Sequence, residues 1–469
     1  MIPAVMSFMM LYVYTRLMDP AEYGQFSLVF TTTLFVQFSI FISVSVAVMR
    51  FLKEAEYAGR KAEFIAACML FLAVPSALVA LVALGLIFQG NAMGGLFCLG
   101  AALTIIRSVV SLTQTVRRAE DRIALFNWVE CGQSVLSLAL GALFMEIWGA
   151  NATAAVSGLL LAAIISAVPS LRLLFEAGMH VGRVNRAELR KLLSFVAPLV
   201  VVDVTVSVLQ LSDRFLLGAL ASASALGVYS VAFNLVDRPT QLLCNAITTA
   251  TFPMAVDAMH RGTLEGRSQM AKNGAALIAL TLPACIGLWL TKGIVVQILV
   301  GPEFRAGAEV LVPIMCMSAL VRGISTHFVD HAFQLASRPS MVLRVYLPAA
   351  IATVVLNILL IPILGAKGAA LAGLVCQVAA LIGGWIAAKR VFPIYLNPTD
   401  LAKIGIALVP MVAWLTSTDF SGSWQGLGAA VGSGAFLFVS GVVLLNVGGV
   451  RGRSGGFAVA LLRRRGRTA

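Results

Sequence analysis

Charged residues inside long apolar stretches are the residues best able to carry chemistry in this chain. Four arginines and three aspartates stand out: Arg16, Arg107, Arg214, Arg238, Asp203, Asp213 and Asp237. A charge in hydrocarbon costs about 2.5–3.5 kcal/mol on insertion scales, so such residues usually serve binding, ion transport or pairing. Arginine suits phosphate, because its planar fork donates two parallel hydrogen bonds and stays charged. We predict that the arginines bind an anionic substrate and that the aspartates couple an ion.

Two other interpretations of these charges stay open, anchoring at the membrane interface and structural ion pairing. Asp203 and Asp213 would point about 80° apart on a helix that turns about 100° per residue. Asp213 and Arg214 are adjacent, so we expect them to face different partners: Asp213 a neighbouring helix, Arg214 a cavity mouth. Asp237 precedes Arg238 and Pro239, where a helix kink frees backbone groups.

Histidine and cysteine offer weaker signals. In "HFVDH", His327, Asp330 and His331 share one helix face, but no further ligand is evident, so we expect a helix end and no metal site. The seven cysteines lie in apolar segments without a CxxC pair and are expected to be small core residues.

The elements that carry these charges must be membrane helices, because the whole chain is apolar. Of 469 residues, 59% are hydrophobic and 12% are charged. Soluble domains are about a quarter charged, so we predict an all-α polytopic membrane protein. The net charge of +13 is better explained by basic cytoplasmic loops than by nucleic acid, which we do not expect as a partner.

About fourteen stretches approach or exceed the roughly 20 residues that a membrane span needs. They lie near residues 1–18, 24–49, 64–88, 94–115, 125–147, 153–175, 192–220, 225–256, 273–300, 306–336, 343–363, 369–388, 401–417 and 427–447. The first is slightly short. Either the first helix is short or the true start lies upstream, and we favour the second, which leaves the first helix truncated.

Basic residues alternate from loop to loop. Every second connection, beginning after the second stretch, carries most of the 34 Lys and Arg residues, whereas the intervening loops carry Arg305 and Lys367. Basic loops mark the cytoplasmic side, so both termini are expected there. Without a large soluble loop or a GxxxxGK[ST] phosphate loop, we predict neither an enzyme nor a bound cofactor.

An internal repeat relates the two halves. "GQFSLVF" (24–30) recurs as "GVYSVAF" (227–233), and "GANATAAVSG" (149–158) is echoed by "GAKGAALAG" (365–373). Six spans per half give both halves the same direction in the membrane. Transporters built from such parallel repeats bind substrate between the halves.

Three segments resemble one known family. "TRLMDPAEYGQFSL" (15–28), "SDRFLLG" (212–218) with "GVYS" (227–230), and "LNILLIPILGAKGAALA" (356–372) are similar to motifs of oligosaccharide-lipid flippases. These belong to the multidrug/oligosaccharidyl-lipid/polysaccharide exporter superfamily. The resemblance covers nearly the whole chain.

This resemblance implies two six-helix bundles in a V around a central cavity that works by alternating access. The expected organisation is a bundle at 1–191, a bundle at 192–398, two extra helices within 399–450 and a basic tail at 451–469. The implied cargo is an undecaprenyl-pyrophosphate-linked oligosaccharide, moved to the periplasmic leaflet of a bacterial inner membrane. Implied partners are membrane lipids and the polymerase or export machinery of capsule, exopolysaccharide or O-antigen.

Two alternatives are weighed against a flippase. A cation-coupled multidrug or small-molecule antiporter of the same superfamily would share the fold. A membrane-embedded glycan polymerase or ligase fits less well, because such enzymes usually carry a large outer loop with catalytic residues, and here every outer loop is short.

Overall fold

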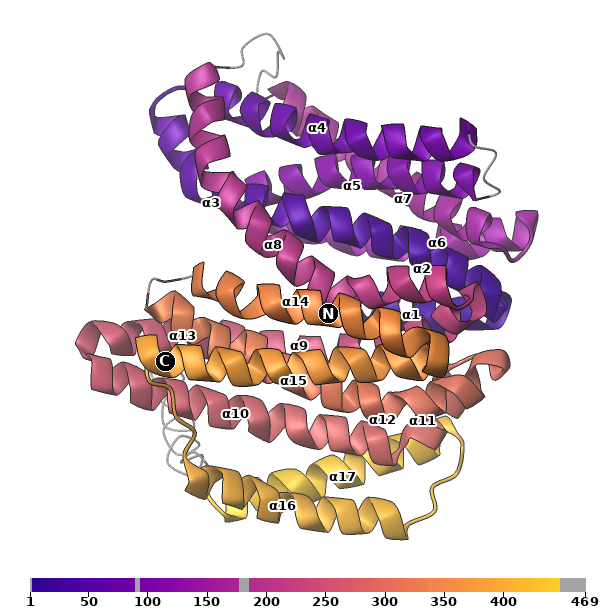
Figure 1. The fold of residues 1–469 in the computed structure, drawn as a ribbon, viewed down its shortest axis with the longest axis vertical. Helices are drawn as coiled ribbons and strands as arrows, with labels where there is room; N and C mark the ends of the chain where they lie inside the picture. The colour runs from indigo at the N-terminus through magenta and orange to yellow at the C-terminus, as the bar shows by residue number, and fades with distance from the viewer. Residues whose placement is uncertain (1, 89–92, 177–184, 337, 339, 448–469) are drawn as a thin grey trace, which may run out of the picture. The chain divides into compact units, whose positions relative to one another are not determined.

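Helices make up nearly all of the described structure (Figure 1). The computed structural model describes residues 2–88, 93–176, 185–336, 338 and 340–447. Thirteen helical segments in these ranges are long and apolar enough to cross a membrane, and the shorter apolar helix Ile2–Leu17 lies where the first span is expected. The predicted all-α polytopic fold is therefore confirmed.

The helices follow the predicted stretches closely. In chain order they are α1 (Ile2–Leu17), α2 (Pro20–Val36), the π-helical η1 (Gln37–Phe41), α3 (Ile42–Tyr57), α4 (Lys61–Phe88), α5 (Gly94–Ala119), α6 (Ile123–Trp148), α7 (Ala152–Glu176), α8 (Arg186–Leu220), α9 (Ala223–Arg261), α10 (Thr263–Leu290), α11 (Lys292–Leu299), α12 (Pro302–Ile324), the π-helical η3 (Ser325–Val329), α13 (Asp330–Leu335), α14 (Ser340–Leu364), α15 (Ala366–Val391), α16 (Pro398–Ser417) and α17 (Trp424–Leu444). The segments α2–η1–α3 and α12–η3–α13 are each one continuous helix.

One predicted stretch, 273–300, is divided. It comprises α10 and the short α11, which meet at Thr291. The Thr291 hydroxyl donates to the carbonyl oxygen of Gly287 at 2.7 Å, a back-bond of the kind that bends helices.

Local capping explains where several helices begin. The Asp19 carboxylate accepts hydrogen bonds from the backbone N–H groups of Ala21 and Glu22, both at 2.8 Å, and Pro20 occupies the first helical position of α2. Glu22 in turn accepts from the N–H of Ala152 at 2.7 Å, so one carboxylate in α2 caps the start of α7. A short acidic motif thus fixes two helix starts.

The chain divides into two compact units. Unit 1 comprises Met1–Val231, Gly301–Phe304 and Tyr346–Gly373. Unit 2 comprises Ala232–Val300, Arg305–Val345 and Leu374–Ala469. The division into six-helix bundles at residue 191 stays a prediction.

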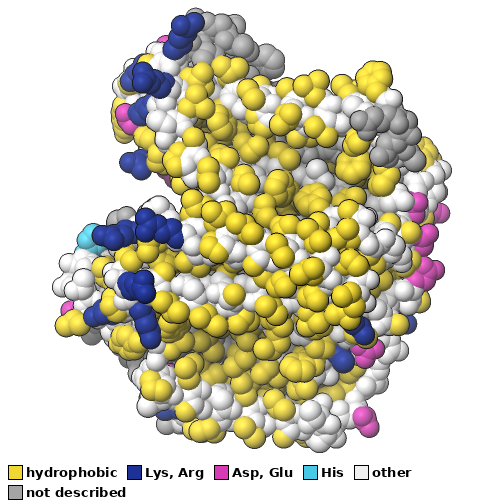
Figure 2. Space-filling model, in the orientation of Figure 1, with side chains coloured by type: hydrophobic (Ala, Val, Ile, Leu, Met, Phe, Trp, Pro, Cys, Tyr) yellow, Lys and Arg dark blue, Asp and Glu magenta, His cyan; other side chains and the backbone are white. Residues whose placement is uncertain are grey.

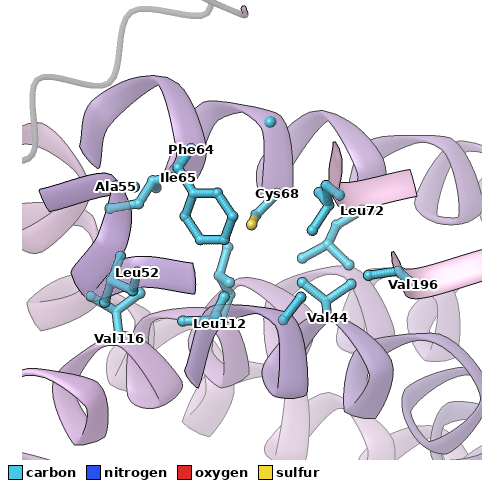
Figure 3. Packing of buried hydrophobic residues seen from close by; sticks show 14 of the residues in the cluster. Val44, Leu52, Ala55, Phe64, Ile65, Cys68, Leu72, Leu112, Val116 and Val196 are labelled. Atoms are coloured by element: carbon cyan, nitrogen blue, oxygen red, sulfur yellow. The ribbon is translucent and has the colours of Figure 1, made fainter. Parts of the chain in front are cut away.

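Each unit has its own apolar core. In unit 1, Phe64 and Cys68 of α4 pack with Val44 of α3, Leu112 of α5 and Val196 of α8 (Figure 3). In unit 2, two clusters fill the interior. The first includes Met270, Phe328, Phe333, Ala388 and Phe392, and the second joins α10 to α16 and α17 through Ile278, Ile404, Leu408, Met411 and Ala430.

The outer surface of each unit suits a membrane. On the face shown in Figure 2, hydrophobic side chains cover the flanks of the helices, and most Lys and Arg side chains gather at one end of them. Exposed apolar side chains on the helix flanks include Val74, Leu78, Ile351, Ile363 and Phe436. A flank of this kind is solvated by lipid tails, which are as apolar as leucine.

Equivalent residues of the sequence repeat meet directly inside unit 1. Gly24 of α2 lies against the backbone of Ala223 and Gly227 in the first turns of α9, and Gly227 lies against Pro20 and Gly24. One turn on, the Ser27 hydroxyl donates to the Ser230 hydroxyl at 2.6 Å in a buried position. Gly24 and Gly227 are 203 positions apart, as are Ser27 and Ser230, and the contacts of the two glycines with Ala223 and Pro20 are related by the same offset, so the contact is reciprocal. We call it the Gly24–Gly227 crossing.

The second pair of repeated segments also adopts matching structure. Gly149 ends α6 with φ 96°, and Gly365 lies between α14 and α15 with φ 57°. Positive φ is costly for residues with a Cβ, which explains glycine at both turns. Both repeated segments therefore begin at a glycine with positive φ.

The crossing predicts that Gly24→Ala destabilises the protein. An added Cβ would clash with the backbone carbonyl of Ala223, so we expect a loss of about 1–3 kcal/mol, seen as a lower melting temperature in detergent. Gly132→Ala in α6 is the matched control, because nothing lies within 4 Å of its added Cβ. Since alanine is the better helix former, this control should be neutral or slightly stabilising. Equal melting temperatures for both variants would contradict the crossing.

Candidate functional site

The predicted site residues separate into several local groups within the two units. Arg16, Arg107, Asp203, Asp213 and Arg214 belong to unit 1, and Asp237 and Arg238 belong to unit 2. Their roles in substrate binding and ion coupling stay predictions, but the structure gives each one a definite environment.

Asp213 and Arg214 lie near the end of α8 and are both buried. The Tyr229 hydroxyl of α9 donates a hydrogen bond to the Asp213 carboxylate, so the expectation that Asp213 joins its helix to a neighbour is confirmed. The expectation that the adjacent pair faces different partners is wrong, because Arg214 Nη1 lies 3.7 Å from Asp213 Oδ1. The long arginine side chain folds back along the helix, where Nη1 also donates to the Gln210 carbonyl oxygen at 3.3 Å.

Arg16 lies at the end of α1 and is exposed. Its guanidinium lies 3.6 Å from the ring centroid of Tyr12 and donates to the Tyr12 carbonyl oxygen at 3.0 Å. Arg107 lies in the middle of α5 and is half-buried, with its guanidinium 5.7 Å from the ring centroid of Phe30 in α2. Both arginines therefore contact an aromatic face, which attracts a cation through its quadrupole.

Asp203 is held by a hydroxyl. Ser43 Oγ donates to Asp203 Oδ2 at 2.5 Å, which joins α3 to α8. Ser43 lies two residues after the end of η1, and π-helical turns inside α-helices are frequent at functional sites. The carboxylate is half-buried, so it combines a polar partner with restricted access.

Asp237 forms the most buried ion pair seen in unit 2. Its carboxylate Oδ1 accepts from Nη2 of Arg322, which brings α9 and α12 together. Arg322 is only 7% exposed, and its guanidinium carbon lies 5.1 Å from the ring centroid of Phe233. The sequence shows Arg322 only as a cation within an apolar stretch. Nothing in the sequence shows that α12 lies against α9.

Arg238, the next residue, has a different environment. Its side chain is half-buried and forms no hydrogen bond or ion pair with any residue that the structure describes. It lies about 22 Å along α9 from Ala223, at about 1.5 Å per residue. Arg238 is therefore a cation deep in a spanning helix, and its guanidinium N–H groups are unpaired among the described residues.

The "HFVDH" segment is part of η3 and α13. His327 Nδ1 lies 2.9 Å from Thr248 Oγ1, and its Nε2 lies 3.4 Å from Gln241 Oε1. The ring of His331 lies against the ring of Phe252, with centroids 4.4 Å apart and the ring planes tilted by 36°. In the described ranges, no three His, Cys, Asp or Glu residues come together to hold a metal ion.

Arg117 is a residue that the sequence left among the loop cations. It lies instead in the last turn of α5 with 0% exposure. Nη1 donates to Gln114 Oε1 at 2.7 Å, whereas Nε and Nη2 have no partner among the described residues. The sequence could not reveal this burial, because Arg117 lies just beyond the predicted apolar stretch 94–115.

The Asp237–Arg322 pair gives a testable stability prediction. Asp237→Asn or Arg322→Gln leaves one buried charge unpaired and should destabilise unit 2 by about 3–5 kcal/mol, whereas the double variant should recover much of that loss. Thermal unfolding in detergent measures it. Glu265→Gln is the control, because it removes the exposed pair Arg261–Glu265 and should cost at most about 1 kcal/mol. Single variants as stable as the unmodified protein would show that the pair is not structurally important.

Both a protein family and a named flippase resemble this chain in sequence. The polysaccharide biosynthesis protein family matches residues 1–259. "Probable flippase AglR" of Haloferax volcanii is 27% identical over 184 residues, which cover 39% of this chain and 37% of that relative. The chain thus aligns with little more than a third of that relative's length.

Solved structures show the same fold. A structure described as lipid II flippase MurJ in an inward closed conformation superposes with a TM-score of 0.77 at 10% identity, covering 95% of this chain and 97% of that one. An inward-facing multidrug resistance MATE family transporter gives a TM-score of 0.67 at 13% identity, covering 83% and 94%. The family match covers more than half of the chain, so this multi-pass membrane protein belongs to the polysaccharide biosynthesis protein family.

Proposed function

We propose that this chain flips a lipid-linked oligosaccharide from the cytoplasmic to the outer leaflet of a bacterial inner membrane, for synthesis of a surface polysaccharide. The family match over residues 1–259 carries this proposal most directly. The names of the two flippases among its relatives support it as well. The polymerase or export machinery of that polysaccharide would be its partner.

The charges within the spanning helices fit such a cargo. A pyrophosphate with several sugars cannot cross hydrocarbon unaided, so its path requires cationic donors inside the membrane. Arg107 lies about 20 Å along α5 from Gly94, and Arg238 lies similarly deep in α9. We place these two arginines first as phosphate contacts. Arg16 and Arg214 rank behind them, because Arg16 lies at a helix end and Arg214 is held by Asp213 and Gln210.

In this proposal Asp203 serves ion coupling, whereas Asp213 and Asp237 serve the structure. Asp203 is the better group for binding a proton or sodium ion, because its described partner is the neutral hydroxyl of Ser43. Asp237 is paired with Arg322 and Asp213 with Tyr229 and Arg214, which favours structural roles for both. Ion coupling at Asp203 is part of the same proposal.

Complementation tests the arginines. In a strain that lacks the gene, Arg107→Ala and Arg238→Ala should each lower surface polysaccharide at least about tenfold, since one charge-assisted hydrogen bond is worth about 1.5–3 kcal/mol. Undecaprenyl-linked intermediates should accumulate in the inner leaflet. Lysine at either position should restore part of the activity by keeping the charge.

Arg261→Ala is the matched control, because Arg261 is 63% exposed and lies at the end of α9. It should complement fully. Full complementation by both test variants at normal expression would overturn the assignment of these arginines. Drug efflux with an unchanged pool of lipid-linked intermediates would favour the antiporter instead.

We also propose that transport proceeds by alternating access, with the Gly24–Gly227 crossing opening in each cycle. In a chain whose seven native cysteines are replaced, Ser27→Cys with Ser230→Cys should form a disulfide, because the two hydroxyl oxygens lie 2.6 Å apart. Oxidation should then abolish flipping, and reduction should restore it.

Ser45→Cys with Thr115→Cys provides the control cross-link. These hydroxyls lie 3.1 Å apart between α3 and α5 within the core of unit 1, a contact that need not open. Flipping should survive oxidation of this pair. Undiminished flipping by fully cross-linked Ser27/Ser230 protein would refute opening at the crossing.

A further inference from the structure

A pocket of about 340 Å³ lies in unit 2 at one end of its helices. Met259 near the end of α9, Thr263 at the start of α10, Leu335 at the end of α13, and Phe392 just after α15 form part of its wall. Phe392 belongs to the buried core, so the pocket has a firm apolar base. Its volume falls at the lower end of the roughly 300–1,000 Å³ typical of ligand sites.

Two arginines give the pocket its charge. Arg338 and Arg390 line it, and their guanidinium groups form no hydrogen bond or ion pair with the described part of the chain. No carboxylate is among the described residues that line the pocket. The nearby acid Glu265 is occupied by Arg261, whose Nε lies 2.9 Å from Glu265 Oε2. The pocket is therefore a concave site with net positive charge.

The start of helix α10 adds to the positive character of the pocket. Helix α10 begins at Thr263, and its preceding residue Gly262 provides no side-chain cap. Thr263, the first residue of α10, lines the pocket, and the positive end of the α10 dipole there favours an anion. Arg267 Nε donates to the Pro393 carbonyl oxygen at 3.0 Å, which joins α10 to the chain after α15 and fixes this geometry.

We propose that this pocket binds the phosphate group of a membrane lipid in the cytoplasmic leaflet. Arginine forks match phosphate oxygens, while Met259, Leu335 and Phe392 offer an apolar wall to the attached lipid. The alternation of basic loops predicts that this end of α9, α13 and α15 lies on the cytoplasmic side. Basic pockets between spanning helices on that side are suited to anionic head groups.

The phosphate has two possible lipid sources, a phospholipid head group or a polyprenyl phosphate. The site is separate from the arginines placed within the spans, and the proposal holds whatever cargo the chain moves. Lipid binding and flipping are therefore tested by independent measurements.

Native mass spectrometry of the purified full chain in detergent provides the test. The probes are dioctanoyl phosphatidylglycerol, a short-chain polyprenyl phosphate, dioctanoylglycerol without phosphate, and inorganic phosphate. We expect one of the two phosphate-bearing lipids to bind, with affinity that falls as salt is raised. The Arg338→Gln/Arg390→Gln variant should bind that lipid at least about tenfold more weakly, a loss of about 1.4 kcal/mol or more.

The control variant is Arg344→Gln/Lys389→Gln. It removes the same charge from exposed residues of α14 and α15 that do not line the pocket, and should bind within about twofold of the unmodified protein. The lipid that binds identifies the source of the phosphate. Equal weakening in both double variants, equal binding of dioctanoylglycerol, or binding of inorganic phosphate alone would overturn the proposal.

Discussion

A polar group within hydrocarbon must find its partner inside the protein, and the internal contacts of both units follow from this constraint. Asp213 is satisfied by Tyr229, Asp203 by Ser43 and Asp237 by Arg322, and in each case the partner comes from another helix. Lipid tails solvate an apolar helix flank as effectively as another helix would, so apolar contact alone does not determine which helices meet. The polar contacts therefore help to determine it. In this chain the charges that first suggest chemistry are therefore also part of what holds each unit together.

Small residues supply the second condition, close approach of helix backbones. At the Gly24–Gly227 crossing the two helices touch through backbone atoms, and Ser27 bonds to Ser230 one turn further on. The signature around Glu22, Tyr23 and Gly24 thus has three structural roles. Glu22 caps α7, and the ring centroid of Tyr23 lies 5.5 Å from that of Phe304. Gly24 forms the crossing itself. In this chain these residues serve the packing of unit 1.

Hydropathy and charge alternation were enough to predict the helices, because a spanning helix is set by about 20 local residues. The break between α10 and α11 at Thr291 and the π-helical segments η1 and η3 were not predicted, since hydropathy carries no signal for them. The site was less predictable. The sequence identified Asp237 as a candidate but could not pair it with Arg322, 85 residues away. Arg117 lies just beyond the predicted stretch 94–115, yet it is fully buried. Pairing across helices depends on rotation about each helix axis, which no local pattern fixes here.

The reciprocity of the Gly24–Gly227 crossing bears on the origin of the fold. Two copies of a half-length chain with the same orientation in the membrane would make this contact isologously, each glycine against the other's backbone, around a twofold axis along the membrane normal. An ancestral homodimer would thus already have possessed the contact before gene duplication and fusion joined its subunits. After fusion the two glycines sit in different sequence surroundings, yet neither can acquire a side chain without displacing the other helix. The crossing therefore restrains divergence of both halves at this contact.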